Sequence, residues 1–106
     1  MSRDQNIASE MSAAIVAAAQ PRRIILFGSR ASGSPDEDSD FDLMVVEDRP
    51  VDRYREMVRL RGLLRSFRVP LDLLVVSEEK YQYWRDTPGN VYHEAAKKGI
   101  TLYEAA

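Results

Sequence analysis

Residues 23–47 read RIILFGSRASGSPDEDSDFDLMVVE, and this stretch decides the fold. Residues 24–27 form a continuous apolar run, which favours a strand buried on both faces over a four-residue helix. Gly28 then permits a tight turn and a close backbone approach to a ligand, and Ser29 adds a hydroxyl beside it. A Gly-Ser pair after a strand is also an ordinary turn, so this pair alone identifies no site.

Asp40 and Asp42 open the second apolar strand of this stretch. Because side chains alternate along a strand, both carboxylates point to one face and Phe41 points to the other. Adjacent carboxylates repel each other unless a cation or solvent screens them, and a Mg²⁺ ion bridging carboxylates and phosphates would do so. The alternative is a solvated strand start that continues the acidic residues 36–38.

A third carboxylate, Asp72, interrupts the apolar run VPLDLLVV at residues 69–76. A carboxylate in such a strand needs a partner if it is buried. If this strand lies beside the one with Asp40 and Asp42, the three carboxylates can converge on one or two divalent ions, as nucleotidyl transfer requires. The alternative is that Asp72 pairs with a nearby arginine.

In order and spacing, these residues closely resemble the signature of the DNA polymerase β-like nucleotidyltransferase superfamily. The signature has a Gly-Ser pair, ten intervening residues, an Asp-x-Asp pair and a later strand aspartate. The segment LFGSRASGSPDEDSDFDLMVV is similar to the corresponding sequence of the minimal nucleotidyltransferases (MNT). These are small domains often paired with a HEPN-domain protein in toxin–antitoxin systems. The resemblance covers about residues 10–104, because HEAAKKGITLYE also resembles the way such domains close. Ser32 departs from the family, which often has an arginine there, and this leaves Arg30 as the basic candidate.

The resemblance implies the nucleotidyltransferase fold and a Mg²⁺-dependent transfer of a nucleoside monophosphate, foremost AMP from ATP, to a hydroxyl on a protein partner. It implies that the partner is a HEPN toxin and that this chain is its antitoxin. The residues implied to bind the nucleotide are Gly28, Ser29 and Arg30. Those implied to be catalytic and to bind the metal are Asp40, Asp42 and Asp72, the last of which completes the metal site or takes the acceptor proton.

Other functions stay open on the sequence alone. The chain could neutralise its partner by binding alone, or act on RNA or a small molecule. A small-molecule substrate is disfavoured because no additional helical domain is present to enclose it. The surfaces expected to contact a protein partner are the arginine-bearing residues 53–65 and the aromatic residues 81–84.

The composition fits one globular domain, which we expect to span residues 1–106. Hydrophobic residues make up 44% of the chain and charged residues 30%, and no apolar run approaches the length of a membrane span. The net charge of −2 argues against a general nucleic-acid binder. Since the chain has no cysteine and no signal-peptide pattern, we expect a cytoplasmic location.

The remaining pattern alternates helices and strands and predicts an α/β domain with a small mixed sheet and helices mainly on one side. Helices are expected at residues 7–19, at 51–67, after Ser77 and at 91–98, with a final short strand at 100–103. The helix at 51–67 is expected to bury one apolar stripe, which comprises Tyr54, Met57, Val58, Leu60, Leu64 and Phe67.

Overall fold

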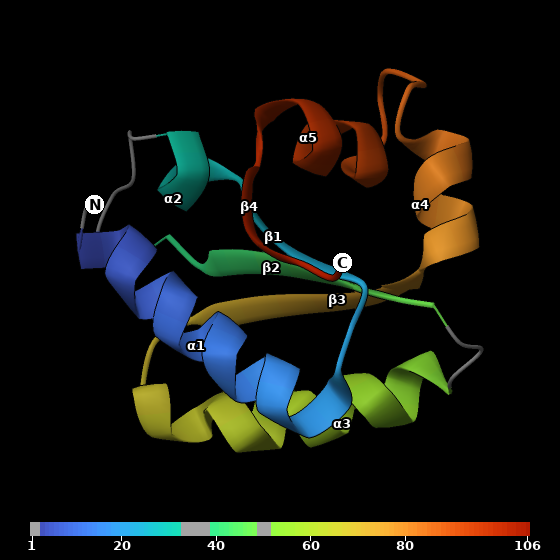
Figure 1. Ribbon diagram of the computed structural model, residues 1–106. Helices are drawn as coiled ribbons and strands as arrows, with labels where there is room; N and C mark the ends of the chain where they lie inside the picture. The colour runs from blue at the N-terminus through green and yellow to red at the C-terminus, as the bar shows by residue number, and fades with distance from the viewer. Residues whose placement is uncertain (1–2, 33–38, 49–51) are drawn as a thin grey trace.

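A four-stranded mixed sheet forms the centre of the computed structural model, which describes residues 3–32, 39–48 and 52–106 (Figure 1). Its strands are β1 (Arg23–Phe27), β2 (Phe41–Glu47), β3 (Leu71–Ser77) and β4 (Ile100–Glu104). Their spatial order is β3-β2-β1-β4. β1 runs antiparallel to β2 and to β4, whereas β2 and β3 are parallel. The expected α/β class with a small mixed sheet is confirmed.

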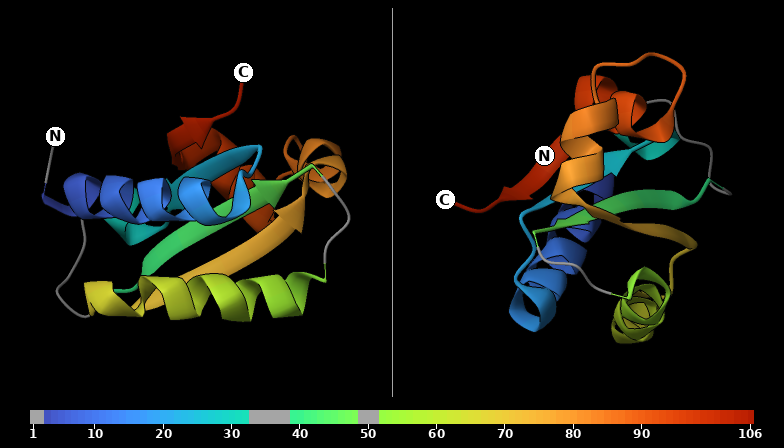
Figure 2. Two further views of the ribbon diagram at one scale, coloured as in Figure 1. Left: turned by 60° about the horizontal axis from the view of Figure 1, so that its bottom comes forward. Right: turned by 90° about the vertical axis from the view of Figure 1, so that its right-hand side faces the viewer.

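The helices lie on both faces of the sheet, so the expectation of helices mainly on one side was wrong (Figures 1 and 2). The helices are α1 (Arg3–Ala19), α2 (Ser29–Ser32), α3 (Arg53–Leu64), α4 (Glu78–Trp84) and α5 (Val91–Lys98), and a 3-10 helix (Arg65–Phe67) extends α3. α1 and α3 cover one face, and α4 and α5 cover the other. None of the helices in the described ranges is long and apolar enough to cross a membrane.

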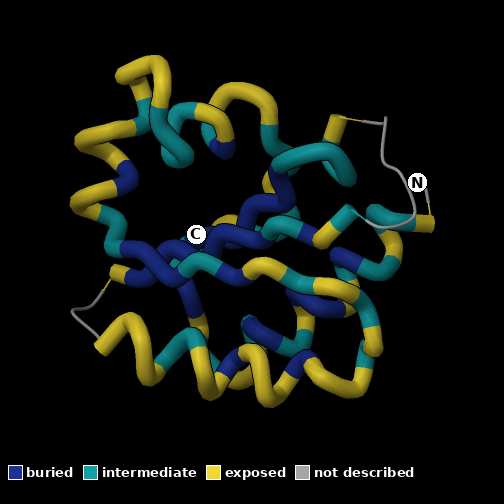
Figure 3. Tube along the Cα trace, turned by 180° about the vertical axis from the view of Figure 1, so that it is seen from behind, coloured by how far each residue is buried: buried dark blue, intermediate teal, exposed yellow. Residues whose placement is uncertain are grey.

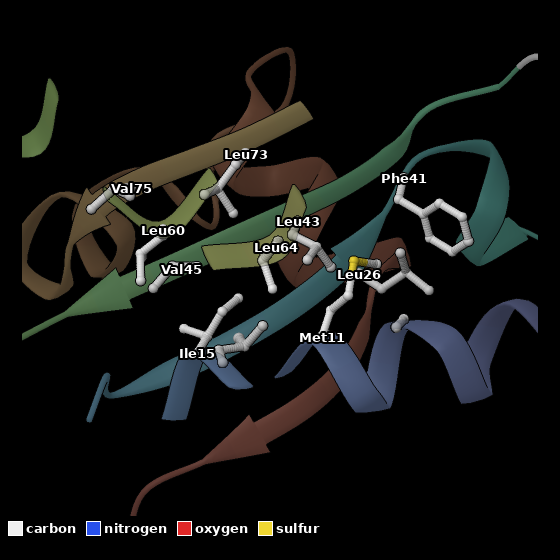
Figure 4. Packing of buried hydrophobic residues seen from close by; sticks show 12 residues of the cluster. Met11, Ile15, Leu26, Phe41, Leu43, Val45, Leu60, Leu64, Leu73 and Val75 are labelled. Carbon is white, nitrogen blue, oxygen red and sulfur yellow. The ribbon is translucent and has the colours of Figure 1, made fainter. Parts of the chain in front are cut away.

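The sheet has an apolar layer on each face, and each layer is shielded from water by helices. β1 is buried at all five of its positions, so its side chains leave water on both sides of the sheet. In β2, Leu43 and Val45 pack into the layer under α1 and α3, which Figure 4 shows from close by. Met44 and Val46 pack into the opposite layer with residues of α4 and α5. The continuous apolar run that predicted a buried strand therefore also required two layers of helices.

α3 buries a narrower stripe than its sequence predicts. Leu60 and Leu64 are buried, but the side chains of Tyr54 and Val58 are 74% and 51% exposed, so the expected burial of these two was wrong. The helix begins at Arg53 because the Asp52 side chain caps it by accepting the backbone N–H of Arg55 at 3.1 Å. The expected helix start at Val51 lies outside the described residues. Seen from behind, α3 presents a largely exposed surface below the buried sheet (Figure 3).

A buried carboxyl at the end of β2 makes the fold sensitive to pH. Glu47 is 6% exposed, and burial together with a hydrogen bond to the Glu56 side chain raises its pKa from 4.5 to about 7. Glu56 is in turn held by Arg59 at 2.8 Å, which lowers the pKa of Glu56. Near neutral pH, Glu47 therefore retains a proton that the unfolded chain would release.

We expect Glu47→Gln to stabilise the fold at alkaline pH only. The stability contributed by protonated Glu47 is fully present below pH 4.5 and is lost as the pH rises through about 7. The amide keeps the neutral form, so the free energy of unfolding at about pH 8 should rise by on the order of 2 kcal/mol and change little at about pH 5. Denaturant titrations at the two pH values measure this difference. Glu10→Gln, at an exposed position of α1, is the control and should show no such pH dependence.

Candidate active site

The turn after β1 brings the backbone against a carboxylate. Gly28 has φ +74°, in the left-handed region, and its carbonyl accepts the N–H groups of Ala31 and Ser32 at 3.1 and 3.2 Å to start α2. A Cβ placed on Gly28 would collide with Oδ2 of Asp42. Glycine is therefore favoured by the backbone angle, and a larger residue would also displace the Asp42 carboxylate.

Strand register places two of the predicted aspartates side by side. Asp42 is the register partner of Phe27 in antiparallel β1 and of Asp72 in parallel β3. Registered residues on neighbouring strands share a face, so the carboxylates of Asp42 and Asp72 lie on the face that α4 and α5 cover. Asp40 directly precedes the strand, two positions before Asp42. The structure thus gathers Asp40, Asp42 and Asp72 at the end of the sheet where α2 follows β1.

The surroundings of Asp42 shift the pKa of its carboxyl group. Its pKa is raised from 3.8 to about 6, first by burial and then by the negative charge of Asp72. The charges of Asp40 and Glu94 act in the same direction. Asp72 is exposed, and the salt bridges of the described residues do not include it, so pairing with an arginine is not observed there. The site therefore has an excess of negative charge that a cation would relieve.

The carboxylates suit a hard cation, but they do not form a complete cage. Within the described ranges, no three His, Cys, Asp or Glu side chains lie close enough together to hold a metal ion on their own. Mg²⁺ characteristically uses one or two carboxylates, several waters and the phosphates of its substrate rather than an all-protein cage. An oxygen-donor set at Asp42 and Asp72 that repels itself and is partly open to solvent fits that mode of binding.

Arg30 has partners within the chain. Its guanidinium forms a salt bridge with Asp4 at 3.1 Å, donates to the Ser39 carbonyl at 2.8 Å and lies 4.6 Å from the centre of the Phe41 ring. These contacts tie α1, α2 and the start of β2 together beside Asp40. The arginine predicted to bind nucleotide thus also anchors the turn on which the site is built.

Glu94 is a site residue that the sequence analysis missed. It lies in the first turn of α5, and its charge reaches Asp42 across the sheet face. Glu94 also lines a hollow of about 510 Å³, together with residues that include Asn90, His93 and Lys98. The ending HEAAKKGITLYE was the available signal, but only the tertiary structure brings α5 to the aspartates.

The family follows from a comparison with known protein families. Residues 9–100 match the nucleotidyltransferase domain, which is most of the chain. The chain belongs to this family. The resemblance inferred from the Gly-Ser and Asp-x-Asp motifs is confirmed at this level. No curated protein is significantly similar to the chain in sequence.

Solved structures share the fold at low sequence identity. A candidate nucleotidyltransferase from Sulfolobus solfataricus superposes with a TM-score of 0.63 and 18% identity, over 96% of this chain and 81% of that one. A mutant of the MntA–HpeT toxin–antitoxin superposes with a TM-score of 0.65 and 16% identity, over 95% of this chain and 73% of that one. A toxin–antitoxin crystallised with AMP-PNP superposes with a TM-score of 0.59 and 17% identity, over 95% of this chain and 73% of that one. At these identities the similarity establishes the nucleotidyltransferase fold.

We expect Gly28→Ala to destabilise the domain more than the same change at Gly89. Gly89 also has positive φ, +95°, but a Cβ there meets no atom within 4 Å, so it isolates the backbone penalty of about 1–2 kcal/mol. Gly28→Ala also forces the Asp42 carboxylate to move and should cost about 1 kcal/mol more than Gly89→Ala. Denaturant unfolding of both variants compares the two costs.

The double variant Gly28→Ala, Asp42→Ala should recover the additional loss, because the colliding carboxylate is gone. Equal costs at positions 28 and 89 would show that Asp42 does not depend on the missing Cβ.

Proposed function

We propose that this domain is a Mg²⁺-dependent nucleotidyltransferase that transfers AMP from ATP to a hydroxyl on a partner protein. The observation that carries the proposal is the gathering of Asp40, Asp42 and Asp72 beside the Gly28 turn, where burial and then the neighbouring negative charges raise the pKa of Asp42. Carboxyl groups with strongly shifted pKa values cluster at functional sites. Membership of the nucleotidyltransferase family supports the same chemistry.

In the proposed reaction, the acceptor oxygen bonds to the α-phosphorus of ATP, the bond from that phosphorus to the bridging oxygen breaks, and pyrophosphate leaves. Asp40 and Asp42 would hold Mg²⁺, which supplies electrostatic stabilisation of the charge on the phosphates. Asp72 completes the metal site or takes the proton from the acceptor hydroxyl. Gly28 lets the triphosphate approach the backbone, and Ser29 donates a hydrogen bond to it. Arg30 lies one residue further along α2, where it also holds the turn in place.

The acceptor in this proposal is a protein rather than a small molecule. Asp40 and Asp72 are exposed, so the described residues leave the acceptor side of the site open to solvent. Transfer to an acceptor requires the hydroxyl to be held in line and water to be excluded. A bound protein would cover this open side, hold its own hydroxyl in line and exclude water.

The partner we propose is a HEPN toxin, which would make this domain its antitoxin in the cytoplasm. Two structural neighbours are toxin–antitoxin assemblies, one of them with AMP-PNP, and they support this context. The competing function is an antitoxin that neutralises its partner by binding alone. The two functions differ in whether the partner gains mass.

We expect the variant Asp40→Asn, Asp42→Asn to abolish transfer while the fold persists. The amides cannot bind Mg²⁺ as carboxylates do, and they remove negative charges that repel one another beside Asp72. Intact-mass analysis after co-expression with the protein encoded by the neighbouring gene is the measurement. The partner should gain one or more AMP masses with the wild-type domain and none with the variant. If the variant neutralises the partner equally well and no mass is ever gained, binding alone is the function.

Nucleotide binding can be tested without a partner. We expect Ser29→Ala to weaken binding of a non-hydrolysable ATP analogue in the presence of Mg²⁺ by about 1.5–3 kcal/mol, the worth of one charge-assisted hydrogen bond. Calorimetric titration measures the affinity. The exposed Ser66, in the 3-10 helix, provides the control variant Ser66→Ala, which should bind as the wild type does. Unchanged affinity in Ser29→Ala would reduce the Gly-Ser pair to an ordinary turn.

A further inference from the structure

One segment of this acidic chain carries an excess of basic residues. Residues 52–68 contain six arginines against two acidic residues, Asp52 and Glu56, although the whole chain has a net charge of −2. The segment comprises α3 and the 3-10 helix that follows it. Such a separation of charge creates a local positive potential that attracts an anionic partner.

Several of these arginines form no salt bridge with the described residues. Arg59 is paired with Glu56 at 2.8 Å, and Arg61 reaches only the Leu71 carbonyl, at 3.4 Å. Arg65 and Arg68 are exposed and form no salt bridge with any residue of the described ranges. The positive charge at the end of α3 is therefore not neutralised by the described part of the fold.

These arginines surround a hollow with an apolar lining. Its volume is about 640 Å³, and its walls are Arg61, Leu64, Arg65, Arg68, Val69, Pro70 and Leu71. We call this hollow the basic groove. Guanidinium groups bind carboxylates through paired hydrogen bonds, while the aliphatic lining accepts apolar side chains. The groove thus suits a segment that combines acidic and apolar residues.

An exposed stripe of α3 extends the groove. Tyr54, Val58, Arg61 and Arg65 follow one another at spacings of four, three and four residues, which places them along one side of the helix. Tyrosine and arginine are the residues that protein interfaces favour. A surface for nucleic acid would instead be expected on a basic domain, whereas this chain is acidic overall. The observations therefore favour a protein occupant.

The basic groove adjoins the candidate active site. Leu71 lines the groove and directly precedes Asp72 in β3, an edge strand of the sheet. Pro70 also lines it, and its carbonyl accepts the N–H of Phe41 at 2.8 Å, one residue before Asp42. In Figures 1 and 2, the end of α3 and the start of β3 lie at the same end of the molecule. A protein seated in the groove would extend past the edge of the sheet to the aspartates.

We propose that the basic groove and the Tyr54–Val58 stripe dock an acidic, leucine-bearing segment of a partner protein. The inference rests on the proposed function only in identifying that partner as the acceptor of AMP. Docking through this surface would hold the acceptor at the open side of the site.

Nuclear magnetic resonance titration of the whole chain tests the proposal without nucleotide transfer, so its failure is distinguishable from failure of the proposed function. The probe is a short synthetic peptide of glutamate, aspartate and leucine, and a uridine oligonucleotide of equal charge is titrated separately. We expect the peptide to shift amide and arginine side-chain resonances within residues 54–71. The variant Arg65→Glu, Arg68→Glu should bind the peptide roughly tenfold more weakly or not at all.

The matched control is Lys80→Glu, Lys98→Glu, which reverses two exposed charges outside the basic groove and outside residues 54–71 and should bind the peptide nearly as the wild type does. If the first double reversal fails to fold, Arg65→Gln, Arg68→Gln removes the same charges without adding acid and should give a smaller loss of the same kind. The proposal is overturned if the peptide shifts residues elsewhere or none, if both double reversals weaken binding equally, or if the oligonucleotide binds these residues more tightly than the peptide.

Discussion

The approach of the Asp42 carboxylate to the backbone of Gly28 is the contact on which this site depends. Three features of the fold meet there: the left-handed turn after β1, the antiparallel register of β1 with β2, and the parallel register that sets Asp72 beside Asp42. A side chain at position 28 would displace the carboxylate, and a shift of one residue in either register would turn it to the other face. The geometry of the site is therefore inseparable from the pairing of the sheet.

The sheet tolerates this acidic end because its remainder is strongly apolar on both faces. β1 and β2 contribute side chains to two separate layers, each closed by a pair of helices. Burial of that area stabilises the fold and offsets the repulsion among the aspartates, which falls at the edge of the apolar layer rather than within it. The repulsion among the carboxylates is thus confined to one end of the sheet, whereas the apolar packing that offsets it involves both layers of the domain.

The candidate site and the end of α3 carry excess charge of opposite sign. Acidic side chains gather where β2 and β3 begin, on the face covered by α5, whereas arginines gather along α3 on the other face. The loop before β3 lies between the two regions. Its Pro70 lines the basic groove, and the Pro70 carbonyl accepts the N–H of Phe41, the residue before Asp42. Among the described residues, none forms a wall over the exposed Asp40 and Asp72. The charge separation offers a way for a second protein to provide it.

The sequence by itself determined the strands, the turn and the catalytic candidates, because alternation, the Gly-Ser pair and the Asp-x-Asp spacing are local properties of the chain. It also sufficed to predict the nucleotidyltransferase family. Only the tertiary structure decided which helices cover which face, the exposure of Tyr54 and Val58, the internal partners of Arg30 and the approach of Glu94 to Asp42. Each of these depends on contacts between residues far apart in the sequence. A periodic pattern shows that a helix has an apolar side, but the width of the side that is buried is set by the neighbours against which it packs.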